Sequence, residues 1–195
     1  EAVGKYTPED QMAVVREVQP ESASVSIREI TSTGLASSAL YEFYSWAKKS
    51  NVLVQHVIYT LAELEKFREL VALGTIPGRK HVVIVALGQY DKSIPDLEME
   101  SRLESFASAF RESDLDLIWF VCSFGKREAQ TVLNAVPAGG HVRIGFENNI
   151  WLPDGRLADS NQTLIKQVSD QLTGDGCHIG NAQDLRDVFR AVIAS

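Results

Sequence analysis

The run HVVIVAL at residues 81–87 decides the fold, because it is almost entirely aliphatic. A strand with one face in water alternates apolar and polar side chains, whereas a strand covered on both faces reads as a continuous apolar run. Parallel sheets are covered in this way by the helices that connect their strands. The run therefore predicts a buried parallel strand inside an α/β domain.

Patterns typical of strands and helices alternate on both sides of this run. Strands are predicted at residues 23–27, 52–59, 81–87, 115–122 and 141–146, and helices at 7–18, 36–49, 60–73, 97–112, 126–135, 161–172 and 182–193. The alternation predicts a parallel sheet with helical cover, formed by residues 1–195 as a single domain without a linker. The pattern fits an open doubly wound sheet and five units of an eight-stranded (β/α) barrel equally well.

Short polar motifs mark the ends of the predicted helices. Thr7, Thr60 and Asn181 each precede a helix and are followed within its first turn by an acid, as N-cap residues often are. Thr60 and Glu63 in particular have the spacing of a capping box. Gly74 follows helix 60–73 and predicts the left-handed residue that ends it.

Composition and charge exclude several classes of protein. The 195 residues carry a formal net charge of −7, so we expect no basic surface for nucleic acid. No run approaches the roughly 18 apolar residues of a membrane helix, and no signal peptide is visible, which predicts a cytoplasmic protein without membrane association. Cys122 and Cys177 lie far apart in sequence and are predicted to be reduced thiols.

The stretch GGHVRIGFENN at residues 139–149 combines a guanidinium, a carboxylate and two amides at the end of the last predicted strand. Side chains alternate along a strand, so Arg143 and Glu147 are predicted to share one face. A guanidinium offers a planar fork of donors to a carboxylate or thioester oxygen, and a glutamate can bind a divalent metal or accept a proton. The alternative interpretation is a simple ion pair at a strand end.

The extended run GGHVRIGFENNIWLPDGRLADSN at residues 139–161 resembles the β-keto acid cleavage enzymes. The likeness continues in PESASVSIRE at residues 20–29, VALGQY at 85–90 and WFVCSFG at 119–125, so it covers essentially the whole chain. The resemblance implies a (β/α)8 barrel of the TIM type, of which these five units match the fourth to the eighth strand. The barrel is then incomplete here, and a homo-oligomer is expected.

The resemblance also implies a reaction and the residues that carry it. The expected enzyme is zinc-dependent and converts a 3-oxo acid and acetyl-CoA into acetoacetate and a new acyl-CoA. Glu147 matches a zinc ligand whose companions form a His-x-His pair, and Arg143 matches a catalytic arginine. Glu29 and Gln55 match substrate-contacting positions. Ser123, Phe124 and Gly125 lie between a predicted strand and a predicted helix, so their backbone N–H groups are candidates to bind an anionic group such as a CoA phosphate, and Ser123 is a candidate substrate-binding residue. Capping of the following helix is the role that the position of Ser123 favours.

Two features of the sequence depart from the family pattern. Asn148 stands where the family usually has an aspartate, and although the motif assigns it to catalysis, an amide can only orient or hydrogen-bond. No His-x-His pair occurs, because His56, His81, His141 and His178 are isolated in sequence. The first two lie in apolar strands and are predicted to be neutral core residues. Three hypotheses stay open: the zinc-dependent cleavage enzyme, a metal-assisted aldolase that does not use CoA, and a non-catalytic or incomplete homologue.

Overall fold

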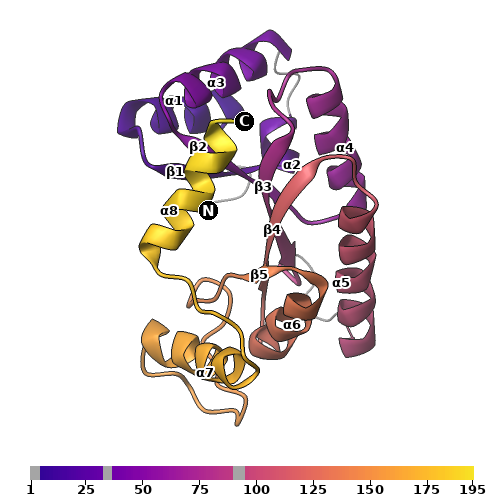
Figure 1. The fold of residues 1–195 in the computed structure, drawn as a ribbon, viewed down its shortest axis with the longest axis vertical. Helices are drawn as coiled ribbons and strands as arrows, with labels where there is room; N and C mark the ends of the chain where they lie inside the picture. The colour runs from indigo at the N-terminus through magenta and orange to yellow at the C-terminus, as the bar shows by residue number, and fades with distance from the viewer. Residues whose placement is uncertain (1–4, 33–36, 90–94) are drawn as a thin grey trace. The chain divides into compact units, whose positions relative to one another are not determined.

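The computed structural model describes residues 5–32, 37–89 and 95–195, apart from the side chain of Asp96. The strands are β1 (Ser22–Ser26), β2 (Leu53–Ile58), β3 (Lys80–Leu87), β4 (Asp116–Ser123) and β5 (His141–Val142). The helices are α1 (Pro8–Val18), α2 (Ile27–Ile30), α3 (Ser37–Lys49), α4 (Leu61–Ala72), α5 (Asp96–Arg111), α6 (Glu128–Ala135), a short 3-10 helix (Val136–Ala138), α7 (Asn161–Gly174) and α8 (Ala182–Ile193). Figure 1 shows this alternation of strands and helices.

The strands form one sheet in the order β1-β2-β3-β4-β5, which is also their order in the sequence. β1 pairs in parallel with β2, with Ser22 opposite Leu53, and β4 pairs in parallel with β5, with Phe120 opposite His141. The predicted α/β fold is therefore confirmed. Doubly wound sheets reverse their strand order at a switch point, and these five strands show no such reversal.

The chain divides into two compact units. The first comprises the described residues of Glu1–Val83 together with Leu115–Leu117 and Leu185–Ser195. The second comprises those of Ile84–Asp114 and Ile118–Asp184. The predicted helix start at Ala36 and the last residue of the VALGQY motif, Tyr90, lie outside the described residues.

The core of the first unit forms where α3 and α4 pack on β2. Phe43 and Phe67 are fully buried on the apolar faces of these helices, and Ile58 is fully buried on the strand. Aromatic contacts continue into the strands, because the ring of His56 lies 4.7 Å from that of Phe67. Amphipathic spacing in the sequence thus translates directly into burial.

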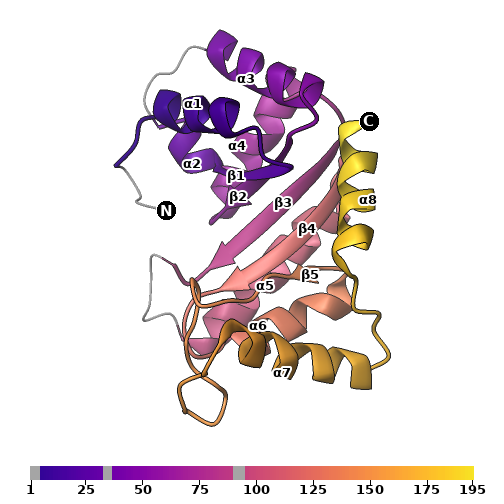
Figure 2. The same ribbon diagram turned by 90° about the vertical axis from the view of Figure 1, so that its left-hand side faces the viewer.

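The core of the second unit forms around β4, with α5 and α6 contacting each other and α6 also contacting α7 and β5 (Figure 2). The rings of Phe110 and Trp119 lie 5.1 Å apart, and Val121 and Val132 are completely buried. The second half of the HVVIVAL run belongs to this unit and is buried throughout, as the aliphatic pattern predicted.

The helix caps follow the sequence in two cases and depart from it in a third. Thr7 with Asp10 forms a reciprocal capping box, and Asn181 with Asp184 exchanges equivalent hydrogen bonds. At α4 the Thr60 hydroxyl accepts from the N–H of Glu63, as expected. The carboxylate of Glu63, however, accepts from the N–H of Tyr59 and pairs with Arg28, so the predicted capping box is only half formed.

The predicted strand at 141–146 was too long, because β5 ends at Val142. The N–H of Arg143 still donates to the carbonyl of Val121 at 2.9 Å, and the chain then leaves the sheet. It turns at Gly145, whose carbonyl accepts from the N–H groups of Asn148 and Asn149. Local hydrogen bonds in this turn outweigh the β-branched pattern that suggested a longer strand.

Gly140 provides a test of packing in the second unit. A Cβ at this position would lie 2.7 Å from the Trp119 ring, so we expect Gly140→Ala to lower the free energy of unfolding by about 1–3 kcal/mol. Gly174→Ala is the matched control, since no atom lies within 4 Å of its added Cβ. Urea unfolding of both variants measures the difference, and equal stabilities would contradict the tight contact.

Candidate functional site

Arg143 and Glu147 form an ion pair immediately after β5. The prediction placed them together through strand alternation, but the structure joins them through the turn at Gly145, which brings residues four apart into contact as one helical turn does. A guanidinium N–H of Arg143 donates to Glu147 Oε2. Both side chains are roughly half exposed, with relative accessibilities of 42% and 47%. The pair is thus accessible to a ligand.

The guanidinium also lies against the end of β4. Its Nη1 is 3.7 Å from Cys122 Sγ, in hydrogen-bonding contact with the thiol. Burial raises the pKa of Cys122 to about 11, despite the opposing effect of the Arg143 charge. Cys122 is therefore a protonated thiol at neutral pH. Both cysteines are free, as predicted.

A carboxylate that the sequence analysis missed lies beneath the turn. Glu128, the first residue of α6, is only 1% exposed. Its Oε1 accepts from the N–H of Gly145 at 3.2 Å and from Asn148 Nδ2 at 3.0 Å, and its Oε2 accepts from Asn149 Nδ2 at 3.5 Å. Burial raises the pKa of Glu128, and these three hydrogen bonds oppose that shift.

One signal in the sequence could have revealed Glu128. In the predicted helix it shares a face with Thr131, Val132 and Ala135 at helical spacing, and all four are buried. A glutamate on an otherwise uncharged inner face is unusual, because a buried carboxylate needs hydrogen-bond donors. The donors come from residues 145–149, which lie much later in the chain, so the helix pattern alone does not name them.

Asn148 acts as a hydrogen-bond donor inside this network. It is 7% exposed, and its Nδ2 contacts the carbonyl of Arg143 at 3.4 Å in addition to Glu128. Its Oδ1 is buried and has no hydrogen-bond partner among the described residues. Asn149 instead fixes the following bend, exchanging hydrogen bonds of 2.9 and 2.7 Å with the backbone of Trp151.

Ser123 is the last residue of β4 and precedes Glu128 by five positions in the sequence. It is completely buried, and in the part of the chain that the structure describes its hydroxyl has no hydrogen-bond partner. The alternative role as a helix cap is wrong, because α6 is preceded by Arg127 and has no side-chain cap. The N–H groups of Phe124 and Gly125 donate to the carbonyls of Leu87 and Asn148, so they do not form an anion-binding loop.

Glu29 and Gln55, the two other predicted site residues, belong to the first unit. Glu29 lies on the short helix α2 rather than on a strand, and its Oε2 accepts from Gln11 Nε2 at 3.2 Å. Gln55 lies on β2, where its Oε1 accepts from the hydroxyl of Ser24 at 3.2 Å. Arg143, Glu147, Asn148 and Ser123 all belong to the second unit.

The described residues do not complete a metal site. Among them no three histidine, cysteine, aspartate or glutamate side chains are grouped closely enough to hold an ion. Glu147 is the single carboxylate of the motif, and it is paired with Arg143. These residues alone therefore do not fit a zinc ion.

No helix in residues 5–32, 37–89 and 95–195 is both long and apolar enough to cross a membrane.

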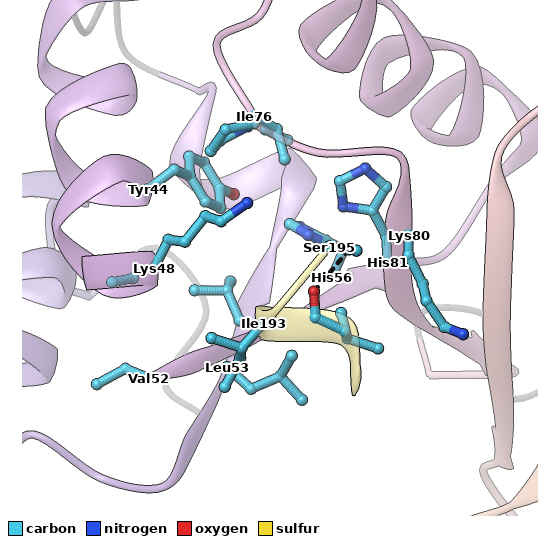
Figure 3. A pocket seen from close by; sticks show the side chains of 14 residues that line it. Tyr44, Lys48, Val52, Leu53, His56, Ile76, Lys80, His81, Ile193 and Ser195 are labelled. Carbon is cyan, nitrogen blue, oxygen red and sulfur yellow. Dashed lines mark hydrogen bonds between the residues drawn. The ribbon is translucent and has the colours of Figure 1, made fainter. Parts of the chain in front are cut away.

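The first unit contains a separate small cavity of about 60 Å³ (Figure 3). His56 on β2 and His81 on β3 line it, with ring centroids 5.8 Å apart, together with Tyr44 of α3. Burial is the main cause that lowers the pKa of His56 well below its ordinary value, and the nearby His81 lowers it further. Burial also lowers the pKa of His81, to about 4. Both are neutral at pH 7, as predicted for core histidines.

These two histidines predict a pH-dependent stability. Their pKa values are lower in the folded protein than the 6.5 of an unfolded chain, so between about pH 6.5 and 4 the unfolded chain takes up protons that the folded protein does not. The free energy of unfolding should therefore fall as the pH drops through this range. Urea unfolding at pH 7 and pH 5 measures the fall, which should be smaller in His56→Phe. The exposed His178→Gln variant should keep the wild-type dependence.

The fold and this charged turn define an α/β protein with a polar group of side chains at the carboxyl end of a parallel strand. The family model described as beta-keto acid cleavage enzyme matches residues 1–190. The chain belongs to this family, which confirms the resemblance seen in the sequence.

Three curated relatives match shorter segments. A 3-keto-5-aminohexanoate cleavage enzyme of Fusobacterium nucleatum subsp. nucleatum is 34% identical over 71 residues, covering 36% of this chain and 26% of the relative. A 3,5-dioxohexanoate:acetyl-CoA acetone transferase of Paraburkholderia graminis is 21% identical over 75 residues, covering 38% of this chain and 24% of the relative. A 3-keto-5-aminohexanoate cleavage enzyme of Acetoanaerobium sticklandii is 29% identical over 69 residues, covering 35% of this chain and 25% of the relative. Each match thus spans about a quarter of the relative's length.

The exposed pair and the buried carboxylate should differ in their effect on stability. Glu147→Gln should change the free energy of unfolding by less than about 1 kcal/mol, because a half-exposed ion pair contributes little. Glu128→Ala should lower it by about 1–3 kcal/mol, because buried donors lose their acceptor. Denaturant unfolding compares the two variants, and a larger loss for Glu147→Gln would contradict this assignment.

Proposed function

We propose that this chain is part of an enzyme that cleaves a 3-oxo acid with acetyl-CoA as co-substrate. C2 of the 3-oxo acid bonds to the acetyl carbonyl carbon as the thioester C–S bond of acetyl-CoA breaks and releases the CoA thiolate. The bond between C2 and C3 breaks, and the acyl group at C3 passes to that thiolate. The products are acetoacetate and a new acyl-CoA. The observation that carries this proposal is a half-exposed arginine–glutamate pair at the end of β5 in a member of this family.

We propose that β1 to β5 are five units of a (β/α)8 barrel. The strand order follows the sequence without reversal, and β1–β2 and β4–β5 are parallel, as in barrels of this type. Enzymes with this fold place their active sites at the carboxyl ends of the strands. Ser123 at the end of β4 and Arg143 just after β5 occupy such positions. A homo-oligomer is proposed from the family resemblance alone.

Arg143 is the residue that we assign to the substrate carboxylate. A 3-oxo acid without a substituent at C2 carries a CH2–COO⁻ group, and acetoacetate retains it, so one guanidinium fork can bind both substrate and product. Its present partner, Glu147, holds it through an exposed contact that a competing carboxylate can replace at small energetic cost. Substrate contacts of Glu29 and Gln55 in the first unit, and of the buried Ser123 in the second, stay predictions from the sequence.

Glu147 and Asn148 have different chemical capacities. Asn148 is a neutral amide and cannot take a proton, so we assign it hydrogen bonding alone. The assignment of Glu147 as a zinc ligand follows from the family resemblance, and among the described residues no further ligands are grouped with it.

Kinetic assay of the full-length protein tests this proposal. With acetyl-CoA and a panel of 3-oxo acids, Arg143→Ala and Glu147→Ala should each lower kcat/KM by about 100-fold or more, because one removes the cation assigned to the substrate carboxylate and the other removes its charged partner at the site. Arg156→Ala is the matched control, since Arg156 also forms an exposed ion pair, with Asp154, in the same region of the chain. An equal loss in the control would contradict a specific role for Arg143.

Two further measurements separate the remaining alternatives. Cleavage that proceeds at the same rate without acetyl-CoA would support a metal-assisted aldolase instead. Zinc analysis of wild-type protein and Glu147→Ala tests the ligand assignment, and equal zinc contents would contradict it. A wild-type protein with neither zinc nor cleavage activity would identify a non-catalytic homologue.

A further inference from the structure

We propose that Glu128 is a positioning residue that fixes the Arg143–Glu147 pair by holding the turn between them, with Asn148 as its hydrogen-bond donor. The structural part of this inference concerns only contacts within the second unit. Its kinetic consequence rests on the proposed function. The element that Glu128 holds is the turn at residues 145–149, which follows β5.

The contacts of Glu128 lie on both sides of Glu147. One carboxylate oxygen accepts from the backbone of Gly145, where the turn begins, and from the side chain of Asn148, directly after Glu147. The same turn is closed by the N–H of Asn148, which donates to the carbonyl of Gly145 at 2.9 Å. The backbone that carries Glu147 is therefore held from both ends by a single buried atom.

Glu128 is itself held in place by a closed ring of hydrogen bonds. Its N–H donates to the carbonyl of Gly125 at 3.1 Å, the N–H of Gly125 donates to the carbonyl of Asn148 at 3.0 Å, and Asn148 Nδ2 donates back to Glu128 at 3.0 Å. The ring joins the loop after β4, the start of α6 and the turn after β5. Because α6 packs on β5 and α7, the ring connects the turn to the core of its unit.

The exposed pair cannot supply this order by itself. Ion pairs between half-exposed side chains contribute little, because water and dissolved salt compete for both charges. Glu128 is 1% exposed, and a buried carboxylate holds its donors firmly because losing one leaves it unpaired away from water. The geometry of Arg143 and Glu147 therefore depends on the buried acceptor more than on their mutual attraction.

The network also explains why an amide suits position 148. Asn148 presents its Nδ2 to Glu128 Oε1 at 3.0 Å. An aspartate in the same rotamer would place a second carboxylate oxygen at that distance, and the two anions would repel each other in a buried site. Asn148 is thus matched to Glu128, and the two side chains act as one unit.

Three substitutions of Glu128 in the full-length protein separate positioning from packing. Glu128→Gln keeps an oxygen that can accept from Gly145 and Asn148, Glu128→Met keeps the volume without an acceptor, and Glu128→Ala keeps neither. All are made with Cys177→Ser, so that Cys122 is the one remaining cysteine of residues 1–195, and its labelling is followed on the peptide that contains it. Asn148→Ala is the second route to the same network if a Glu128 variant does not fold, because it removes the donor without exposing a new charge.

Two readouts are independent of catalysis. The side-chain N–H signals of Arg143 in NMR spectra report its pairing, and the rate of Cys122 labelling by a thiol reagent reports closure of the site, since Cys122 is buried against the guanidinium. We expect Glu128→Gln to match wild type in both. Glu128→Met, Glu128→Ala and Asn148→Ala should lose the distinct Arg143 signals and label Cys122 at least about 10-fold faster.

The kinetic readout divides the effect between kcat and KM. Glu128→Met should lower kcat by about 100-fold, as a misplaced reacting group does, with a smaller change in KM and with rescue in Glu128→Gln. A Glu128→Met variant with wild-type Arg143 signals and labelling rate would overturn the proposal. Wild-type protein without cleavage activity would overturn the proposed function instead, and the NMR and labelling results would still decide the role of Glu128.

Discussion

The carboxylate of Glu128 is the constraint on which the rest of the site depends. A carboxylate that is 1% exposed is stable only where donors surround it, and here they come from Gly145, Asn148 and Asn149. Satisfying it forces the chain after β5 to leave the sheet and turn back over the start of α6. The turn then presents Arg143 and Glu147 to solvent. The need of the buried Glu128 carboxylate for hydrogen-bond donors thereby determines where the two exposed charged side chains lie.

Burial and exposure divide the tasks of structure and chemistry between neighbouring residues. Glu128 and Asn148 are buried and hold the backbone, whereas Arg143 and Glu147 remain half exposed and free to exchange partners. An ion pair that were itself buried would resist a competing substrate carboxylate, because separating its charges away from water is costly. The half-exposed pair above a buried carboxylate has a fixed position and a weak mutual attraction, which is what the proposed binding of a substrate carboxylate by Arg143 requires.

The sequence predicted the fold through patterns that depend on neighbouring residues alone. The HVVIVAL run identified a buried parallel strand. Helical spacing located α3, and cap residues located α4 and α8, each to within a few residues. The prediction failed for β5, where Val142 and Ile144 suggested a strand that hydrogen bonds to Gly145 interrupt. It also missed Glu128, because its donors lie 17 to 21 residues further along the chain. Long-range polar contacts leave no periodic trace in a sequence.

Position 148 shows how the meaning of a residue changes once its contacts are known. Judged by the motif alone, an amide in place of an acid removes a proton acceptor from position 148, since an amide cannot take up a proton at neutral pH. In the structure the same amide donates to a buried carboxylate and to the carbonyl of Arg143. An acid there would leave Glu128 facing another anion. Asn148 therefore takes no part in proton transfer, and with Glu128 it holds the turn that carries Glu147.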